Sequence, residues 1–76
     1  MTAEERRHAI QVAIGARLAI EAAEQSIKRS YIGYGRISFP TVAKVLRGDN
    51  CKVSSLIAVA DALGCDVEIT IHKRTA

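Results

Sequence analysis

The sequence predicts a small, mostly α-helical domain of four to five helices with one β-strand near the C-terminus. Three observations predict this fold class. The chain has 76 residues, so we expect one domain over residues 1–76. Aromatic residues make up only 4% of it, so Ala, Val, Ile and Leu must build the core. Apolar residues recur at helical spacing up to residue 63 and then alternate near the end.

The first helix is expected from Thr2 to about Gln25. Thr2 followed by Glu5 fits a capping box at the start of a helix. Apolar residues lie on two sides of this helix, which favours deep burial or packing against two bodies. Gly15 weakens the middle of the helix by about 1 kcal/mol relative to Ala. A break there would make residues 1–13 a separate helical extension.

Residues 26–36, with the sequence SIKRSYIGYGR, allow two interpretations. In the first, Ser26 caps a short helix. The inward side of that helix would carry Ile27, Tyr31 and Ile32. In the second, the segment is an irregular loop, because its two glycines interrupt regular structure.

The segment ISFPTVAKVLRGDN predicts a helix from Ser38 to Arg47. Ser38 is a favourable N-cap, and Pro40 lies in the first turn, where its missing N–H group costs nothing. Gly48 is the expected C-terminal stop. The apolar stripe of this helix consists of Val42, Val45 and Leu46. The opposite side carries Thr41, Lys44 and Arg47.

A further helix is expected from Ser54 to Leu63. After it, apolar and polar residues alternate over residues 66–73, which predicts a half-buried strand. The apolar face of this strand would carry Val67, Ile69 and Ile71. Because no second strand is apparent, pairing with the same strand of a second chain would satisfy one edge and make a homodimer. The alternative is a strand that packs against its own first helix.

The charge distribution favours an anionic partner. The net charge is +3, and between residues 25 and 52 Asp49 is the single acidic residue. The cations of that stretch are Lys28, Arg29, Arg36, Lys44, Arg47 and Lys52.

Other classes of function find no support in the sequence. No signal peptide or membrane span is apparent, so we expect a cytoplasmic protein in which Cys51 and Cys65 are free thiols. The Cys and His residues match no zinc-ligand spacing. Neither a phosphate-binding glycine loop nor a nucleophile motif is present. We therefore expect no enzyme activity, no metal and no cofactor.

The helix from Ser38 to Arg47 has the features of a DNA-reading helix. The major groove of DNA is about 12 Å wide and admits one helix, whose first turn must bring short side chains to the base edges. The residues expected to contact bases are Phe39, Pro40, Thr41 and Lys44. The residues expected to contact phosphates are Lys28, Arg29, Arg36, Ser38, Arg47 and Asn50.

The segments ISFPTVAKVLRGDN and VSSLIAVADALG resemble the second half of the lambda-repressor-like (Cro/C1, also called XRE) helix-turn-helix family. Residues 14–26 are similar to its first helix. The resemblance implies a lambda-repressor-like fold and the same base-reading residues. It also implies phosphate contact by Arg47, DNA contact by Asn50 and burial of Val42 and Val45. In YIGYGR the glycines come early and Arg36 takes the usual turn position, which indicates a shortened or displaced preceding helix.

We therefore predict a sequence-specific transcriptional regulator that binds double-stranded DNA as a homodimer on a palindromic operator. Phages, mobile elements and toxin–antitoxin operons use such regulators, and an antitoxin would also bind a toxin, for which the first helix offers a surface. The alternative is a protein-interaction or inhibitor module on a helix-turn-helix scaffold without DNA function. An aromatic residue followed by Pro, as at Phe39 and Pro40, is common in protein contacts and motivates this alternative.

Overall fold

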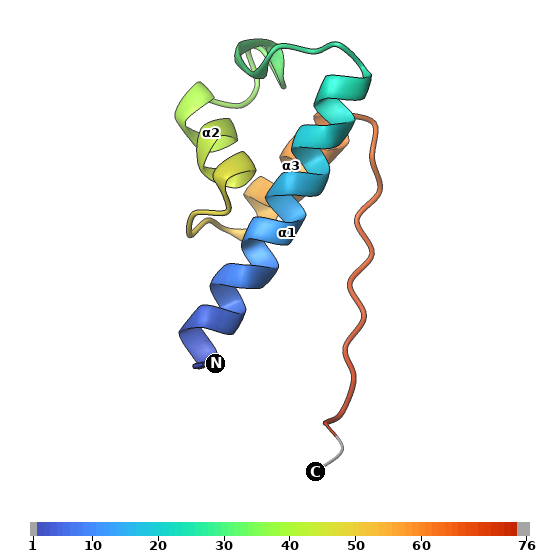
Figure 1. Ribbon diagram of the computed structural model, residues 1–76. Coiled ribbons are helices and arrows are strands. Elements are labelled where there is room, and N and C mark those ends of the chain that lie inside the picture. The colour runs from blue at the N-terminus through green and yellow to red at the C-terminus, as the bar shows by residue number, and fades with distance from the viewer. Residues whose placement is uncertain (1, 75–76) are drawn as a thin grey trace.

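The computed structural model describes residues 2–74. Over that range the chain forms α1 (Ala3–Glu24), the 3-10 turn η1 (Arg29–Tyr31), α2 (Phe39–Arg47) and α3 (Val53–Ala62). Figure 1 shows α1 as the longest element, with α2 to one side of it and α3 behind. The prediction of four to five helices and a C-terminal strand is therefore wrong, because the described chain has three α-helices and no strand.

The first helix is continuous. The Thr2 hydroxyl accepts a hydrogen bond of 3.1 Å from the Glu5 N–H group, as expected for a capped start. Gly15 does not break α1. Its lack of a side chain permits close packing, since an added Cβ there would lie 2.5 Å from the Val45 carbonyl oxygen of α2. The expected extension at residues 1–13 is, from residue 3 onward, the first part of this same helix.

All the helices share one core, and α2 lies at its centre because it packs against α1, α3 and η1. Burying a large aliphatic side chain stabilises a fold by about 1.5–3 kcal/mol. The apolar stripe predicted for the helix that ends at Arg47 is confirmed as part of this core. The buried residues are Leu18, Ala22, Ile32, Val42, Val45, Leu46, Val59, Ala60 and Leu63.

Polar contacts fix the ends of α1 and α3 to each other. The Gln25 side-chain amide donates a hydrogen bond of 2.6 Å to the Leu63 carbonyl oxygen. The Cys65 N–H group donates one of 2.8 Å to the Ala60 carbonyl oxygen, just after α3 ends. The start of the C-terminal segment is therefore held close to the end of α1.

The segment between α1 and α2 is a loop with one 3-10 turn, which is the second of the two predicted interpretations. Ser26 has a φ of 57°, so it adopts a left-handed conformation and does not cap a new helix. Ile32 is buried as expected, but Tyr31 is 60% exposed, so the prediction that Tyr31 points inward is wrong. Gly33 follows with a φ of 61°, which ends the turn before it can become a helix.

The predicted strand at residues 66–73 is an extended segment with no ladder to any other part of the described chain. A strand requires backbone hydrogen bonds to a neighbouring strand, and residues 2–65 contain no strand with which this segment could pair. Figure 1 shows the segment running back beside α1 toward the N-terminus. The exposed fractions of its apolar residues rise along the chain, from 40% at Val67 to 67% at Ile69 and 90% at Ile71.

Candidate nucleic-acid interface

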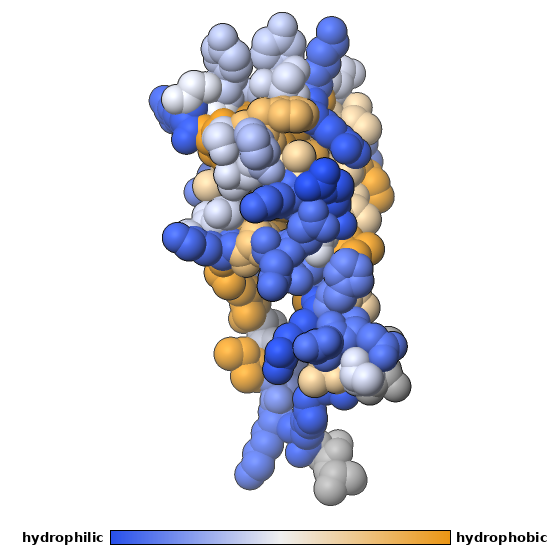
Figure 2. All heavy atoms as spheres, turned by 90° about the vertical axis from the view of Figure 1, so that its left-hand side faces the viewer, coloured by the Kyte–Doolittle hydropathy of each residue, from blue (hydrophilic) through white to orange (hydrophobic). Residues whose placement is uncertain are grey.

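An exposed strip runs along α2 on the side opposite the core. Because an α-helix has about 3.6 residues per turn, the buried residues of α2 share one side. Pro40, Lys44 and Arg47 project from the other side, and all of them are exposed. Figure 2 views the molecule from the side on which α2 lies, and hydrophilic side chains cover much of the middle of that face. The sequence-predicted contrast between the two sides of this helix is present in the fold.

The first turn of α2 is open to solvent, as a base-reading turn must be. Phe39 is 54% exposed and Pro40 is exposed, whereas Thr41 is half-buried. Ser38 occupies the N-cap position as predicted, but its hydroxyl forms a 2.7 Å hydrogen bond with the Thr41 hydroxyl and does not cap the backbone. The Thr41 and Val42 N–H groups both donate to the Ser38 carbonyl oxygen. Side chains, more than backbone groups, are therefore available to a ligand at this turn.

An ion pair holds the basic side chain at the other end of α2. Arg47 contacts the Asp49 carboxylate at 2.9 Å and donates a hydrogen bond of 3.1 Å to it from Nε. The Arg47 side chain is 60% exposed, so water screens this pair, and such surface pairs contribute about 1 kcal/mol or less. A phosphate can compete with Asp49 for the guanidinium group. Asn50, the predicted loop contact, is exposed beside them.

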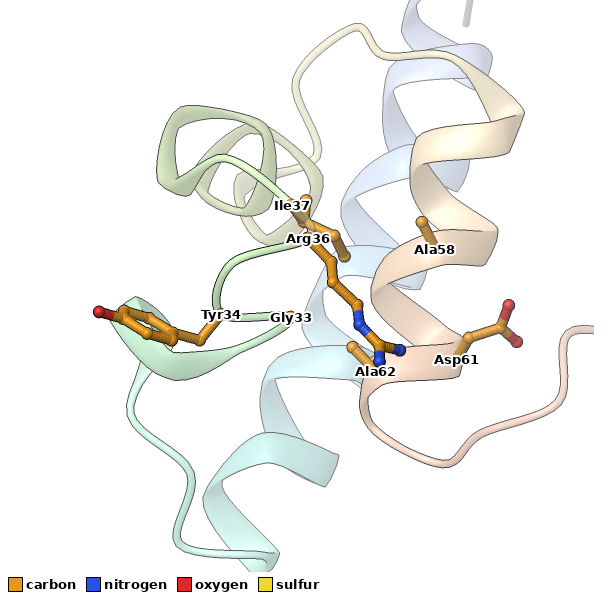
Figure 3. A pocket seen from close by; sticks show the side chains of 7 residues that line it. All are labelled: Gly33, Tyr34, Arg36, Ile37, Ala58, Asp61 and Ala62. Carbon is orange, nitrogen blue, oxygen red and sulfur yellow. The ribbon is translucent and has the colours of Figure 1, made fainter.

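The predicted loop cations divide into two groups. Lys28 and Arg29 are exposed at the start of η1, which packs against α2. Arg36 lies apart from the exposed strip: Figure 3 shows its side chain extending toward Ala62 of α3, while Tyr34 points the opposite way. These residues belong to the lining of a hollow of about 610 Å³ between the loop and α3. The structure therefore gathers Lys28 and Arg29 at an element in contact with α2 and directs Arg36 elsewhere.

Two exposed tyrosines lie in the loop before α2. The Tyr31 and Tyr34 rings are 6.0 Å apart and tilted by 60°, and Tyr34 is 77% exposed. Phenol groups of this kind can donate hydrogen bonds to phosphates. The sequence could not place them, because an irregular loop has no period that tells an inward residue from an outward one.

The beginning of α1 adds a cation that the sequence did not suggest. Arg7 and His8 line a polar hollow of about 460 Å³ together with Asp49 and Asn50 of the loop after α2. Arg7 comes there through the packing of α1 against α2, which joins residues far apart in the chain. No local sequence pattern could have indicated this neighbourhood.

No three His, Cys, Asp or Glu side chains within residues 2–74 lie close enough together to hold a metal ion. Cys51 and Cys65 are free and half-buried. Among the helices that the structure describes, none combines the length and the apolar composition of a bilayer span.

Over residues 2–74 the fold and the site define an arrangement of three α-helices whose middle helix is packed on one side and exposed, with basic residues, on the other. No family model, no curated protein and no solved structure matches the chain. The resemblance to the lambda-repressor-like family is therefore a hypothesis, and the features that bear on function are those of α2 and its surroundings.

Proposed function

We propose that this protein is a sequence-specific DNA-binding transcriptional regulator that works as a homodimer on a palindromic operator. The proposal assigns it to the lambda-repressor-like helix-turn-helix class, which residues 37–64 resemble. One observation carries the proposal: α2 is packed by its inner side chains and open along its outer side and first turn. A helix held in this way presents its outer side chains in a fixed geometry, which direct reading of bases requires.

In this proposal α2 lies in the major groove with Phe39 and Pro40 leading. These two side chains offer apolar contacts to thymine methyl groups, and Lys44, one turn later, donates hydrogen bonds to a guanine edge. Arg29 in η1 and Arg47 at the end of α2 bind phosphates and fix the register. Two copies on a palindrome place their α2 helices about 34 Å apart in successive major grooves.

Substitution of Lys44 and Arg47, the two cations of the strip, tests these roles. Duplexes selected from a random library by the wild-type chain define a preferred site, and fluorescence anisotropy at several salt concentrations measures affinity. Lys44→Ala should weaken binding to the preferred site by about 5- to 100-fold and reduce the preference over random duplex, because it removes a base contact. Arg47→Ala should weaken binding to both duplexes alike and reduce the salt slope by about 1, because it removes a phosphate contact.

Lys73→Ala is the matched control for these variants. Lys73 is exposed in the C-terminal segment, so the variant loses one positive charge away from α2. Its affinity for both duplexes should stay close to that of the wild type. Unchanged affinity in the Lys44 and Arg47 variants would refute their assigned roles, and failure of the selection to enrich any duplex would refute the DNA function.

A protein-interaction or inhibitor module is the second candidate function. It is favoured by the exposed aromatic side chains in and just after the loop, namely Tyr31, Tyr34 and Phe39. Aromatic residues are enriched among those that dominate protein–protein binding energy. The duplex selection separates the two functions, because an interaction module without DNA function enriches no sequence.

A further inference from the structure

A continuous apolar groove lies between the first half of α1, the start of α3 and the extended C-terminal segment. Its volume is about 450 Å³. Its apolar lining consists of Ile10, Ile14, Cys51, Val53, Leu56, Ile57, Val67 and Ile69. Its polar lining consists of Arg7, Gln11, Asn50 and Glu68. We refer to these residues as the apolar groove.

The apolar groove leaves large aliphatic side chains in contact with water. Ile10 and Val53 are each 55% exposed, and Ile57 is 41% exposed. A chain of this length buries only about 60% of its unfolded surface, so its core alone gives little stability. Contiguous exposed apolar surface on a small domain marks a site of association with another molecule.

The charges of the apolar groove match a second copy of the same surface. Arg7 on α1 and Glu68 on the C-terminal segment carry opposite charges and stand on different segments of its lining. In a two-fold contact the same patch meets itself, so Arg7 of one copy can face Glu68 of the other, and the reverse. DNA is a poor occupant, because its phosphates would meet aliphatic side chains and a carboxylate.

We propose that a second copy of this chain covers the apolar groove in a two-fold dimer. Ile10 and Ile57 of each copy pack into the groove of the other, and the Arg7–Glu68 pairs set the register. The contact is made by side chains and needs no β-ladder. No residue of α2 lines the groove, so the exposed strip of α2 stays free in such a dimer. Arg7 and Asn50, which also lie near the end of α2, belong to the groove lining and are assigned to the dimer contact. This inference rests on the proposed function for the use of the dimer, which is the homodimer that a palindromic operator requires.

Analytical ultracentrifugation over a concentration series tests the surface directly. Wild-type chain should sediment as a dimer at the higher concentrations. Ile10→Asp and Ile57→Asp should each raise the dimer dissociation constant by about 100-fold, because each places a carboxylate in a buried apolar contact. Ile20→Asp is the matched control, since Ile20 is 49% exposed on the same helix but outside the groove, and its dissociation constant should be unchanged. Far-ultraviolet circular dichroism checks that each variant is folded.

A charge exchange tests the two-fold register. Arg7→Glu and Glu68→Arg should each weaken the dimer by about tenfold, because each puts like charges together across the contact. The variant with both substitutions restores opposite charges and should dimerise nearly as well as the wild type. Single variants without effect, or a double variant weaker than either, would contradict the register.

The dimer and the DNA function can fail separately. A wild-type chain that stays monomeric overturns the inference, whether or not it associates with a different protein. A dimer that is unaffected by Ile10→Asp and by Ile57→Asp overturns it as well. Binding to a duplex with one half-site reports on α2 alone. Monomeric Ile57→Asp should keep half-site binding and lose the tighter binding to the full palindrome. Half-site binding that is absent in the wild type counts against the proposed function and leaves the dimer test standing.

Discussion

At the scale of single residues, Asp49 pairs with the basic side chain at the C-terminal end of α2. Its carboxylate holds Arg47 through an ion pair of 2.9 Å and a hydrogen bond of 3.1 Å. The Arg47 side chain is 60% exposed and that of Asp49 is 47% exposed, so water screens the pair and another anion can replace Asp49. Asp49 therefore acts as an internal competitor for the phosphate that Arg47 is proposed to bind.

Replacing Asp49 with Asn should raise affinity for DNA. The substitution frees Arg47 and removes a negative charge beside the proposed phosphate contact, so we expect an increase of about 2- to 10-fold on preferred and random duplexes alike. Fluorescence anisotropy at low salt measures it. Asp66→Asn makes the same charge change in the C-terminal segment and should have a smaller effect. A loss of affinity in Asp49→Asn would mean that Asp49 positions Arg47 for DNA instead of competing with it.

The sequence predicts side-chain direction well inside a helix and poorly in a loop. Burial of Val42 and Val45 and exposure of Lys44 follow from the helical period, and the structure confirms them. Tyr31 and Arg36 lie in an irregular segment where no period applies. Tyr31 turns outward and lies beside Tyr34, whereas Arg36 extends toward α3 (Figure 3), and the local sequence reveals neither direction.

At the scale of elements, the contact between α1 and α2 depends on two glycines, one on each side. The Gly15 position faces the Val45 and Leu46 carbonyl oxygens, at 2.5 and 2.7 Å from an added Cβ. Gly48 has a φ of 78°, and a Cβ added there would lie 2.6 Å from the Val12 Cα atom. From the sequence, Gly15 is a weak point of a helix. In the structure, α2 packs this closely on α1 because position 15 has no Cβ.

Gly15→Ala should destabilise the protein even though Ala favours helix. The added methyl group meets backbone carbonyls that cannot move independently, so we expect the free energy of unfolding to fall by about 1–3 kcal/mol in urea denaturation. Ala16→Gly at the next, exposed position measures the intrinsic helix preference, which should cost about 1 kcal/mol. If Gly15 were an ordinary helix position, Gly15→Ala would instead raise stability by about as much as Ala16→Gly lowers it.

The start of α1 and both ends of α2 were predictable because the sequence carries capping and stop residues there, whereas α3 begins after Lys52 without a side-chain cap. Thr2 caps α1, and the Ser38–Gly48 pair brackets α2 within a residue of the predicted bounds. The segment at residues 66–73 was not predictable in this way, because a strand needs a partner that the alternation of apolar residues does not supply. The alternation remains, in an extended segment whose apolar side chains are exposed or line the apolar groove.

At the scale of the whole molecule, two surfaces serve two proposed contacts. The described chain is elongated, with extents of 45 × 21 × 20 Å, and Figure 1 shows α2 and the C-terminal segment on opposite sides of α1. The exposed strip of α2 suits an anionic duplex, and the apolar groove suits a second copy. The strip lies on one helix and follows from its period, whereas the apolar groove joins segments distant in the chain, such as Arg7 with Asn50, so its composition follows from the fold.

The most direct test of the central claim is a titration of the isotopically labelled chain with its selected duplex, followed by amide chemical shifts in NMR spectra. If α2 enters the major groove, the largest changes fall at residues 38–47 and at Lys28 and Arg29, with little change at Ile57 in the apolar groove. Changes that centre on the apolar groove and spare α2, or no saturable change with any duplex, would contradict the central claim.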